Sequence, residues 1–256
     1  MIDFLDFLSR LKGISVERPN KQGNGTLSGH AAGEPFEKAA YRILKSTYPN
    51  RVFKQFEFLN DIYLKNPKCI SLAQRNSLIQ SPTVLFLLTR GDKATLNWNP
   101  ENVFEEKQND TADIIFLENN FYSLIDIKTK NASKTSQPPN IISAYKLAKM
   151  CANMLDNEDF ESFSLNYIEI EWFERNEFLK CSNAYYANLF KATPKSLYIN
   201  WAAALQIQFF VSSLDQSFGG TRKIWCQEYL RNFVESASRR CEKMKHDYIT
   251  PFLGYL

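Results

Sequence analysis

The sequence predicts a mixed α/β fold in which helices and strands share one domain. Three observations support this prediction. Apolar residues recur at helical spacing near both ends of the chain, short apolar runs bounded by turn residues occupy its middle, and no repeat or linker divides its 256 residues. A single domain over residues 1–256 is therefore the simplest organisation, with an added small helical subdomain as a variant of it.

The first half of the chain predicts two helices, a short apolar element and a hairpin. Residues 2–11 and 35–48 have apolar side chains at helical spacing, and the polar, glycine-bearing residues 18–35 predict a loop. Residues 82–88 (PTVLFLL) form a buried strand or a short helix. Residues 112–128 predict a β-hairpin, with ADIIFL and FYSLIDIK as strands and ENN as the turn.

The second half predicts two helices and two strands. Asn140 is a good N-cap residue, and it precedes apolar residues at helical spacing over 141–155. Residues 163–173 and 197–211 are expected to be strands, and a long amphipathic helix begins at Thr221 and ends near residue 246.

The composition is that of an ordinary globular protein, but its basic residues are unevenly distributed. The formal charge of +3 is too small to prove a nucleic-acid partner. Residues 128–150, however, hold five lysines and no acid, and residues 222–245 hold seven basic residues against three acidic ones. Such segments suit a polyanion such as DNA, although a pair of solvated helix faces explains them equally well.

Cysteine and histidine usage argues against two classes of site. Five cysteines without a CxxC pair indicate reduced thiols, and two histidines argue against the usual zinc site. The N-terminus has no signal-peptide pattern, and the longest apolar run, TVLFLL, is too short to span a bilayer. We therefore expect a soluble cytoplasmic protein that does not act at a membrane.

Charged residues inside the apolar hairpin strands are the main chemical signal. Asp126 and Lys128 share a strand face, and the hairpin can bring Asp113 beside them. Burying these charges without partners would be costly, whereas Mg²⁺ commonly binds one or two carboxylates together with substrate phosphate. Such a metal activates a water against a phosphodiester, and the lysine orients that water or stabilises charge on the phosphate. A surface hairpin with a Lys–Asp pair is the alternative.

The same residues resemble a known motif. Asp113, Asp126, Ile127 and Lys128 look like the PD-(D/E)xK nuclease motif, with Ala112 in place of the usual proline. Four blocks resemble the HincII-like family of type II restriction endonucleases, in order from about residue 25 to the C-terminus. They are GTLSGHAAGEPFEK (25–38), FEEKQNDTADI (104–114), PNIISAYKLA (139–148) and LYINWAAALQIQF (197–209).

The resemblance implies a restriction-endonuclease-like core, with a central mixed β-sheet flanked by helices. It further implies a Mg²⁺-dependent homodimer that cuts both strands of double-stranded DNA and leaves blunt ends at a short palindrome, GTYRAC or a close relative (Y is pyrimidine, R is purine). A cognate DNA methyltransferase, not physically bound, would belong to the same restriction–modification system. The small helical subdomain would then serve dimerisation.

Residue by residue, the resemblance implies that Asp113 and Asp126 are metal ligands and Lys128 is the catalytic lysine. Thr129 would help to place water at the site. Glu37 would support the metal site, with a surface helical glutamate as the alternative.

The resemblance also assigns residues to DNA recognition. Gln137 matches a residue that wedges into the base stack, where deformable pyrimidine–purine steps lower the cost, and Pro138 replaces an alanine of the family pattern. Asn140 and Asn200 match base-contacting asparagines, although an N-cap role and a structural role in a strand are the respective alternatives.

The remaining assignments are weaker in pattern. Gln108 and Asn109 match a segment that faces the minor groove, and His30 is structural or lies near DNA because it has no nucleophile partner. Four basic residues are candidates for phosphate contacts, with ordinary solvated charges as the alternative: Arg90, Lys93, Lys130 and Lys134.

Three functions fit the sequence. A sequence-specific, metal-dependent DNA endonuclease is the leading hypothesis. A repair or structure-selective PD-(D/E)xK nuclease would keep the fold and change the substrate. A DNA-binding protein without catalysis is disfavoured, because Asp113, Asp126 and Lys128 are all present.

Overall fold

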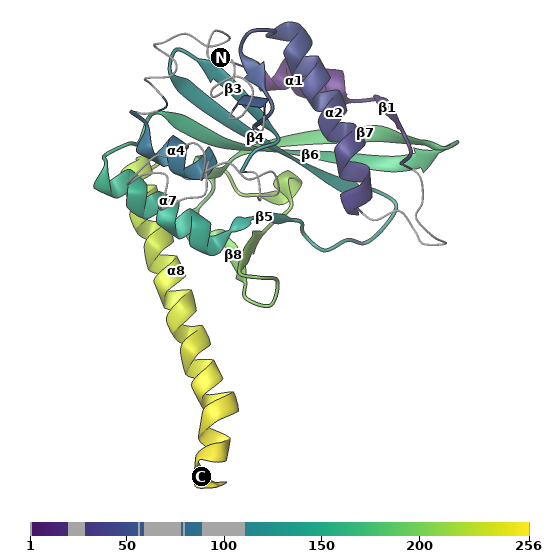
Figure 1. The fold of residues 1–256 in the computed structure, drawn as a ribbon. Helices are drawn as coiled ribbons and strands as arrows, with labels where there is room; N and C mark the ends of the chain where they lie inside the picture. Colours follow the sequence, from purple (N-terminus) through teal and green to yellow (C-terminus); the bar gives the residue numbers. More distant parts are fainter. Residues whose placement is uncertain are drawn as a thin grey trace.

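A six-stranded mixed sheet forms the centre of the molecule, and helices lie over both of its faces (Figure 1). Apart from the side chains of residues 29–32, the computed structural model describes residues 2–19, 29–55, 57–58, 78, 80–88 and 111–255. The strand order is β1-β7-β6-β4-β3-β2, in which β4 and β6 are parallel and the other neighbours antiparallel. These strands are β1 (Ser15–Glu17), β2 (Val52–Phe53), β3 (Ile114–Glu118), β4 (Phe121–Asn131), β6 (Phe163–Arg175) and β7 (Phe178–Asn188).

A smaller antiparallel sheet has the order β5-β9-β8. Its strands are β5 (Asn140–Ser143), β8 (Tyr198–Asn200) and β9 (Gln206–Gln208). Parallel strands need a long crossover connection, and β5 with helix α7 (Ala144–Asp156) supplies the one between β4 and β6. The small sheet is thereby tied to the strand that carries the charged motif.

The helices divide between the two faces of the central sheet. Helices α1 (Phe4–Leu11) and α2 (Gly29–Thr47) cover one face, and α4 (Pro82–Leu88) and α7 lie on the other (Figure 1). Helix α8 (Arg222–Met244) starts beside α7 and then runs away from the sheet, so the C-terminus lies far from the core (Figure 1). Short helical turns complete the chain: η3 (Leu189–Lys191), η4 (Pro194–Ser196), η5 (Val211–Ser213), η6 (Lys245–Ile249) and η7 (Thr250–Tyr255).

Side-chain alternation along β4 separates two hydrophobic cores. Ile125 and Ile127 pack into the core formed with α1 and α2. Tyr122 and Leu124 belong to the opposite core, together with residues of α4, α7 and the start of α8. The even-numbered residues that follow on β4 therefore point to the α7 side of the sheet.

The β3–β4 hairpin confirms the prediction for residues 112–128. Glu118 pairs with Phe121, which leaves Asn119 and Asn120 as a two-residue turn with φ values of 48° and 65°. Asparagine tolerates this left-handed conformation better than most residues, and two such residues match the twist of the flanking strands. The turn sequence thus fixes the register that places the charged residues.

Several other elements match the prediction. Helix α1 begins after Asp3, whose side chain accepts hydrogen bonds from two backbone amides, and α8 begins after the N-cap residue Thr221. Strand β6 spans the strand expected at 163–173. Residues 82–88 are helical, which resolves the two alternatives for that buried run.

Two boundaries were predicted wrongly. Helix α2 begins at Gly29, so the expected loop ends earlier and Pro35 lies inside the helix. Asn140 is not the N-cap of α7, because it is the first residue of β5 and Ser143 caps the helix through the amide of Lys146. The signals from Pro35 and Asn140 are local. The start of α7 is instead decided by the pairing of β5 with β9, which keeps Asn140 in a strand.

Residues 197–211 are not one strand, and one long strand was not predicted. The segment forms β8 and β9 around a turn in which Ala204 and Leu205 have positive φ values. Strand β7 was missed because its outward-facing half is polar and its apolar alternation is weak. Within the part of the chain that is described, no helix is long and apolar enough to cross a membrane.

Candidate active site

The charged pair on β4 lies in a nearly closed environment. Lys128 Nζ is 2.7 Å from Asp126 Oδ2, and the two side chains are 21% and 12% exposed. The strand is paired with β3 on one side and β6 on the other, so its backbone cannot shift without breaking both ladders. Asp126 and Lys128 share one face, as alternation predicted.

Asp113 joins this pair from the residue before β3. Since Ile114 pairs with Ile125, Asp113 lies across from Asp126. The backbone N–H of Ile127 donates to Asp113 Oδ2 at 2.6 Å, which fixes the direction of the carboxylate. The hairpin therefore brings the three motif residues together as the sequence predicted.

Glu37 on α2 is the fourth charged group near the site. Burial, followed by the nearby Asp113 carboxylate, raises the pKa of Glu37 to about 7, and Lys128 opposes that shift. A Cβ atom at position 33 would lie 3.1 Å from Glu37 Oε1, so Gly33 leaves room for this carboxylate. The half-buried position supports the site-supporting interpretation of Glu37 over the surface alternative.

Burial is the main cause of the pKa shifts of the two motif carboxyl groups, because nearby positive charge does not fully compensate it. It raises the pKa of Asp126 to about 7, with Lys128 opposing and Asp113 adding to the rise. Burial also raises the pKa of Asp113, against the Ile127 hydrogen bond. Burial lowers the pKa of Lys128, but pairing with Asp126 outweighs it and the net shift is upward. One ammonium thus faces three carboxyl groups.

This donor set fits a divalent cation. Asp126 Oδ2 is buried and forms an ion pair with Lys128. Within the described part of the chain it accepts no hydrogen bond of regular geometry. Burial disfavours the negative charges of Asp113 and Asp126, and a cation held between these carboxylates would compensate them. No group of three or more His, Cys, Asp or Glu side chains among the described residues is arranged to bind a metal. Mg²⁺ commonly completes such a set with water and phosphate.

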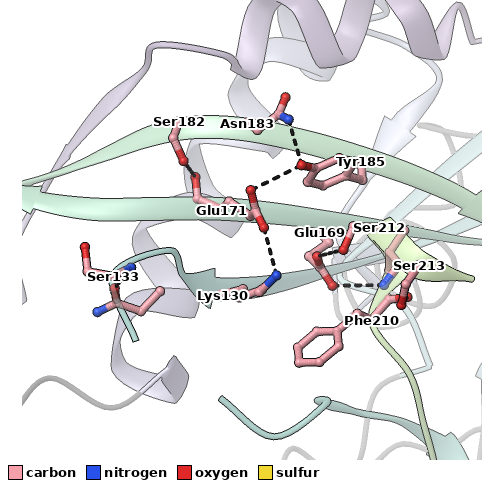
Figure 2. A network of polar contacts seen from close by, with 12 residues as sticks. Lys130, Ser133, Glu169, Glu171, Ser182, Asn183, Tyr185, Phe210, Ser212 and Ser213 are labelled. Carbon is pink, nitrogen blue, oxygen red and sulfur yellow. Dashed lines mark hydrogen bonds and ion pairs between the residues drawn. The ribbon is translucent and has the colours of Figure 1, made fainter. Parts of the chain in front are cut away.

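The polar face continues beyond Lys128 with fully paired charges (Figure 2). Lys130 Nζ is 2.8 Å from Glu171 Oε1 and lies 4.8 Å from the centre of the Phe210 ring. The Tyr185 hydroxyl donates to Glu171 Oε2 at 3.2 Å. Lys130 is therefore held by the protein, while Lys134 is exposed in the following loop. Thr129 lies on the opposite face of β4 from Lys128, by strand alternation.

The two asparagines assigned to DNA recognition come together through a glutamine. Asn200 Nδ2 donates to Gln208 Oε1 at 2.8 Å, and Gln208 Nε2 donates to Asn140 Oδ1 at 2.8 Å. The three side chains form a chain of amides, here called the amide ladder, across β8, β9 and β5. Asn200 Oδ1 also accepts from the amides of Ala202 and Ala203, which fixes its orientation.

Known proteins with the same sequence pattern identify the family. A model of the family described as Restriction endonuclease HincII matches residues 7–256. The chain belongs to the HincII family. The type II restriction enzymes HindII and HincII, both from Haemophilus influenzae, are each 52% identical to it over 253 residues, or 99% of this chain and 97% of each relative.

Membership in the HincII family bears on three predictions. The prediction that the chain is a type II restriction endonuclease is confirmed. Family membership also confirms the restriction-endonuclease fold class, which the mixed sheet with helices on both faces also matches. It also indicates a divalent-metal requirement, as expected for type II restriction endonucleases. The carboxylate pair on the β3–β4 hairpin is the part of this chain that fits that requirement.

The other predicted site residues lie away from the charged motif or outside the described part of the chain. Gln137 is exposed in the segment between β4 and β5, next to the half-buried Pro138. Four assigned residues lie outside the described part of the chain, as does the side chain of His30: Arg90, Lys93, Gln108 and Asn109.

Sequence reasoning missed Gln208, Glu169 and Glu171. Gln206 and Gln208 alternate with an apolar residue, and so do Glu169 and Glu171 in the stretch IEIEW, which signals a polar strand face. Neither pattern shows which partner faces it, because several of those partners, such as Asn140 and Lys130, come from distant parts of the chain.

Proposed function

We propose that this type II restriction endonuclease hydrolyses both strands of double-stranded DNA at a short palindrome, GTYRAC or a close relative, with Mg²⁺ as cofactor and blunt ends as product. One observation carries the proposal. The Asp113, Asp126 and Lys128 side chains converge on one buried site in a chain that is 52% identical to two type II restriction enzymes over nearly its whole length.

Asp113 and Asp126 would hold the cation, which when bound supplies Lewis-acid activation of water and of the phosphate. The Ile127 amide keeps Asp113 turned toward the site. Lys128 remains an ammonium, since pairing with Asp126 raises its pKa. We therefore assign Lys128 to donating a hydrogen bond to the water or to a phosphate oxygen, where it stabilises the charge that develops as the P–O bond breaks.

Glu37 is suited to a supporting role in the same site. Its carboxyl has a pKa of about 7, so it accepts or releases a proton near neutral pH. We propose that it compensates charge around Asp113 and Lys128 rather than touching the phosphate. Thr129, assigned to water placement, lies on the opposite face of β4 from Lys128. It would reach a water at the site only around the end of the strand.

Base recognition is assigned to the amide ladder and the loop beside it. An amide presents a donor and an acceptor to base edges, and Asn can pair with adenine in this way. Gln137 lies in the loop that runs from β4 to Asn140, so a wedge at that position would act between the site of cutting and the bases read. We assign any phosphate role to Lys134 and Lys93 rather than Lys130, which Glu171 already holds.

A palindrome read by one kind of subunit requires two-fold symmetry, so we propose that the protein acts as a homodimer. We further propose that residues 1–256 form one endonuclease domain, with a small helical part serving dimerisation. A methyltransferase of the same specificity would protect the host DNA without binding this protein.

Digestion of a plasmid of known sequence tests the proposal. With Mg²⁺ we expect discrete fragments whose ends are blunt and map to GTYRAC or a close relative. A smear, or cutting only at branched or damaged DNA, would favour the repair or structure-selective alternative. Tight binding without any cleavage in Mg²⁺ would favour a DNA-binding protein that lacks catalysis.

A further inference from the structure

Residues 209–212, here called the bridging segment, follow β9 directly and cross the polar face of β4 and β6. The Tyr167 and Phe209 rings meet edge to face with centroids 5.8 Å apart, and Lys130 Nζ lies over the Phe210 ring. The next two residues contact Glu169 (Figure 2). The chain thus leaves the amide ladder at Gln208 and is fastened at once to the central sheet.

Two of the residues that contact the bridging segment are register partners of motif residues. In the parallel β4–β6 pair, Tyr167 is the register partner of Asp126, and Glu169 is the register partner of Lys128. Paired residues of neighbouring strands share a face, so the contacts of the bridging segment are made on the face that carries the motif. The distance along the chain from Gln208 to this anchorage is only a few residues, which leaves little slack between the two sites.

Glu169 makes the most directional of these contacts. Its side chain is fully buried. The Val211 backbone N–H donates to Oε2 at 2.9 Å, and the Ser212 hydroxyl donates to Oε1 at 2.7 Å. Hydrogen bonds to a carboxylate are shorter and stronger than neutral ones, and using both oxygens fixes the orientation of the bridging segment.

We propose that Glu169 is a positioning residue for sequence discrimination, which holds the amide ladder at a fixed place relative to Lys128. The inference rests on the proposed function, because it takes the ladder to read bases and Lys128 to act at the phosphate. With Glu169 in place, only a site whose bases fit the ladder also delivers its phosphate to Lys128. Without it, the ladder and the catalytic residues no longer act as one rigid unit.

Three variants test this role against a matched control. Glu169→Ala removes both hydrogen bonds, Glu169→Gln keeps one carbonyl acceptor and the shape, and Ser212→Ala removes one donor. Ser213→Ala is the control, because the Ser213 hydroxyl lies in the same turn but donates to the Phe210 carbonyl. The measurement is kcat and KM on a cognate duplex and on duplexes with one substituted base pair, together with the melting temperature of each variant.

For Glu169→Ala we expect cognate kcat to fall by about 10²-fold, as a misplacement of roughly 1 Å can cause, while KM changes little. Cleavage of substituted sites should fall less, so the ratio of cognate to substituted cleavage shrinks. Glu169→Gln should restore most of this ratio, Ser212→Ala should lie between them, and Ser213→Ala should match the wild type.

The inference is overturned if folded Glu169→Ala keeps the wild-type ratio, or if every variant loses activity only in proportion to its loss of thermal stability. If Glu169→Ala does not fold, Ser212→Ala decides, and an unchanged ratio in that variant contradicts the role. Wild-type protein that cleaves no DNA site at all would instead refute the proposed function, so the two failures are distinguishable.

Discussion

Two neighbouring regions around strand β4 differ in how far their buried charges are compensated by charges of opposite sign. Around Lys128, one ammonium faces the carboxyl groups of Asp113, Asp126 and Glu37, and burial raises the pKa of each of these acids. Two residues further along the same strand, the Lys130 ammonium forms an ion pair with a single carboxylate, that of Glu171.

The second region is fully satisfied. The Tyr185 hydroxyl donates to Glu171, and Asn183 Nδ2 donates to the Tyr185 oxygen at 2.8 Å (Figure 2). Pairing with Glu171 raises the pKa of Lys130, as expected for a stabilised ammonium. Lys128 and Lys130 lie on β4 with the same alternation, so the strand that carries them does not explain the difference. The surplus of negative charge makes the first region suited to binding a cation, whereas the charges of the second region are already compensated within the protein.

The largest effect is expected from breaking the first region at Asp126. Asp126→Asn keeps the shape and removes a charged ligand, so Mg²⁺-dependent cleavage should fall by about 10³-fold or more, the upper range for losing one electrostatic element of a site. Single-turnover cleavage of a cognate duplex at saturating Mg²⁺ measures this. Activity within tenfold of the wild type would show that Asp126 is not a ligand.

A smaller effect is expected on stability in the absence of metal. The pKa of Asp126 is about 7 in the folded protein against an ordinary value of 3.8, so the folded state binds the proton more tightly. This contribution to stability is complete below about pH 4 and is lost as the pH rises through about 7. The free energy of unfolding of the wild type, relative to Asp126→Asn, should therefore fall by about 1–3 kcal/mol between pH 5 and pH 8.

Chemical denaturation of both proteins in chelator at the two pH values checks this. Added Mg²⁺ should then stabilise the wild type at pH 8 and leave Asp126→Asn unchanged. A difference between the two proteins that does not depend on pH would contradict the account of charge surplus.

The smallest effect is expected from the second region. Glu171→Gln removes the charge that Lys130 pairs with, but keeps an acceptor for Tyr185. The pair is partly exposed, so its loss should lower stability by about 1 kcal/mol or less and change cleavage only a few-fold. Melting curves and cleavage rates in parallel measure both. A loss comparable to that of Asp126→Asn would place Glu171 inside the catalytic site and remove the contrast between the regions.

The sequence predicted the proposed catalytic region better than the region to which we assign base recognition. Strand periodicity and the Asn119-Asn120 turn are local signals, and together they bring Asp113 beside Asp126. The amide ladder has no local signal, because Asn140 meets Gln208 only after the chain has folded over 68 residues. The same distant pairing explains why Asn140 was predicted as an N-cap. Residues 197–211 were predicted as one strand for a local reason, because the turn between β8 and β9 (WAAAL, residues 201–205) has no glycine, proline or asparagine to signal it.

The position of Glu37 was also beyond the sequence alone. Its role depends on where α2 crosses the central sheet, and the helix begins at Gly29 rather than at Pro35. The pairing of Glu169 with the bridging segment is likewise a matter of packing between elements that the sequence places 42 residues apart. Family resemblance supplied the proposed roles of Asn140 and Asn200, but not the glutamine that connects them.

The central claim is that Asp113, Asp126 and Lys128 form the centre that cuts DNA, and Lys128→Ala tests it most directly. Binding of a cognate duplex and its cleavage in Mg²⁺ should be measured on the same preparation. We expect specific binding to persist, because the amide ladder is untouched, while the cleavage rate falls by about 10²–10⁴-fold. Full cleavage by Lys128→Ala would contradict the account.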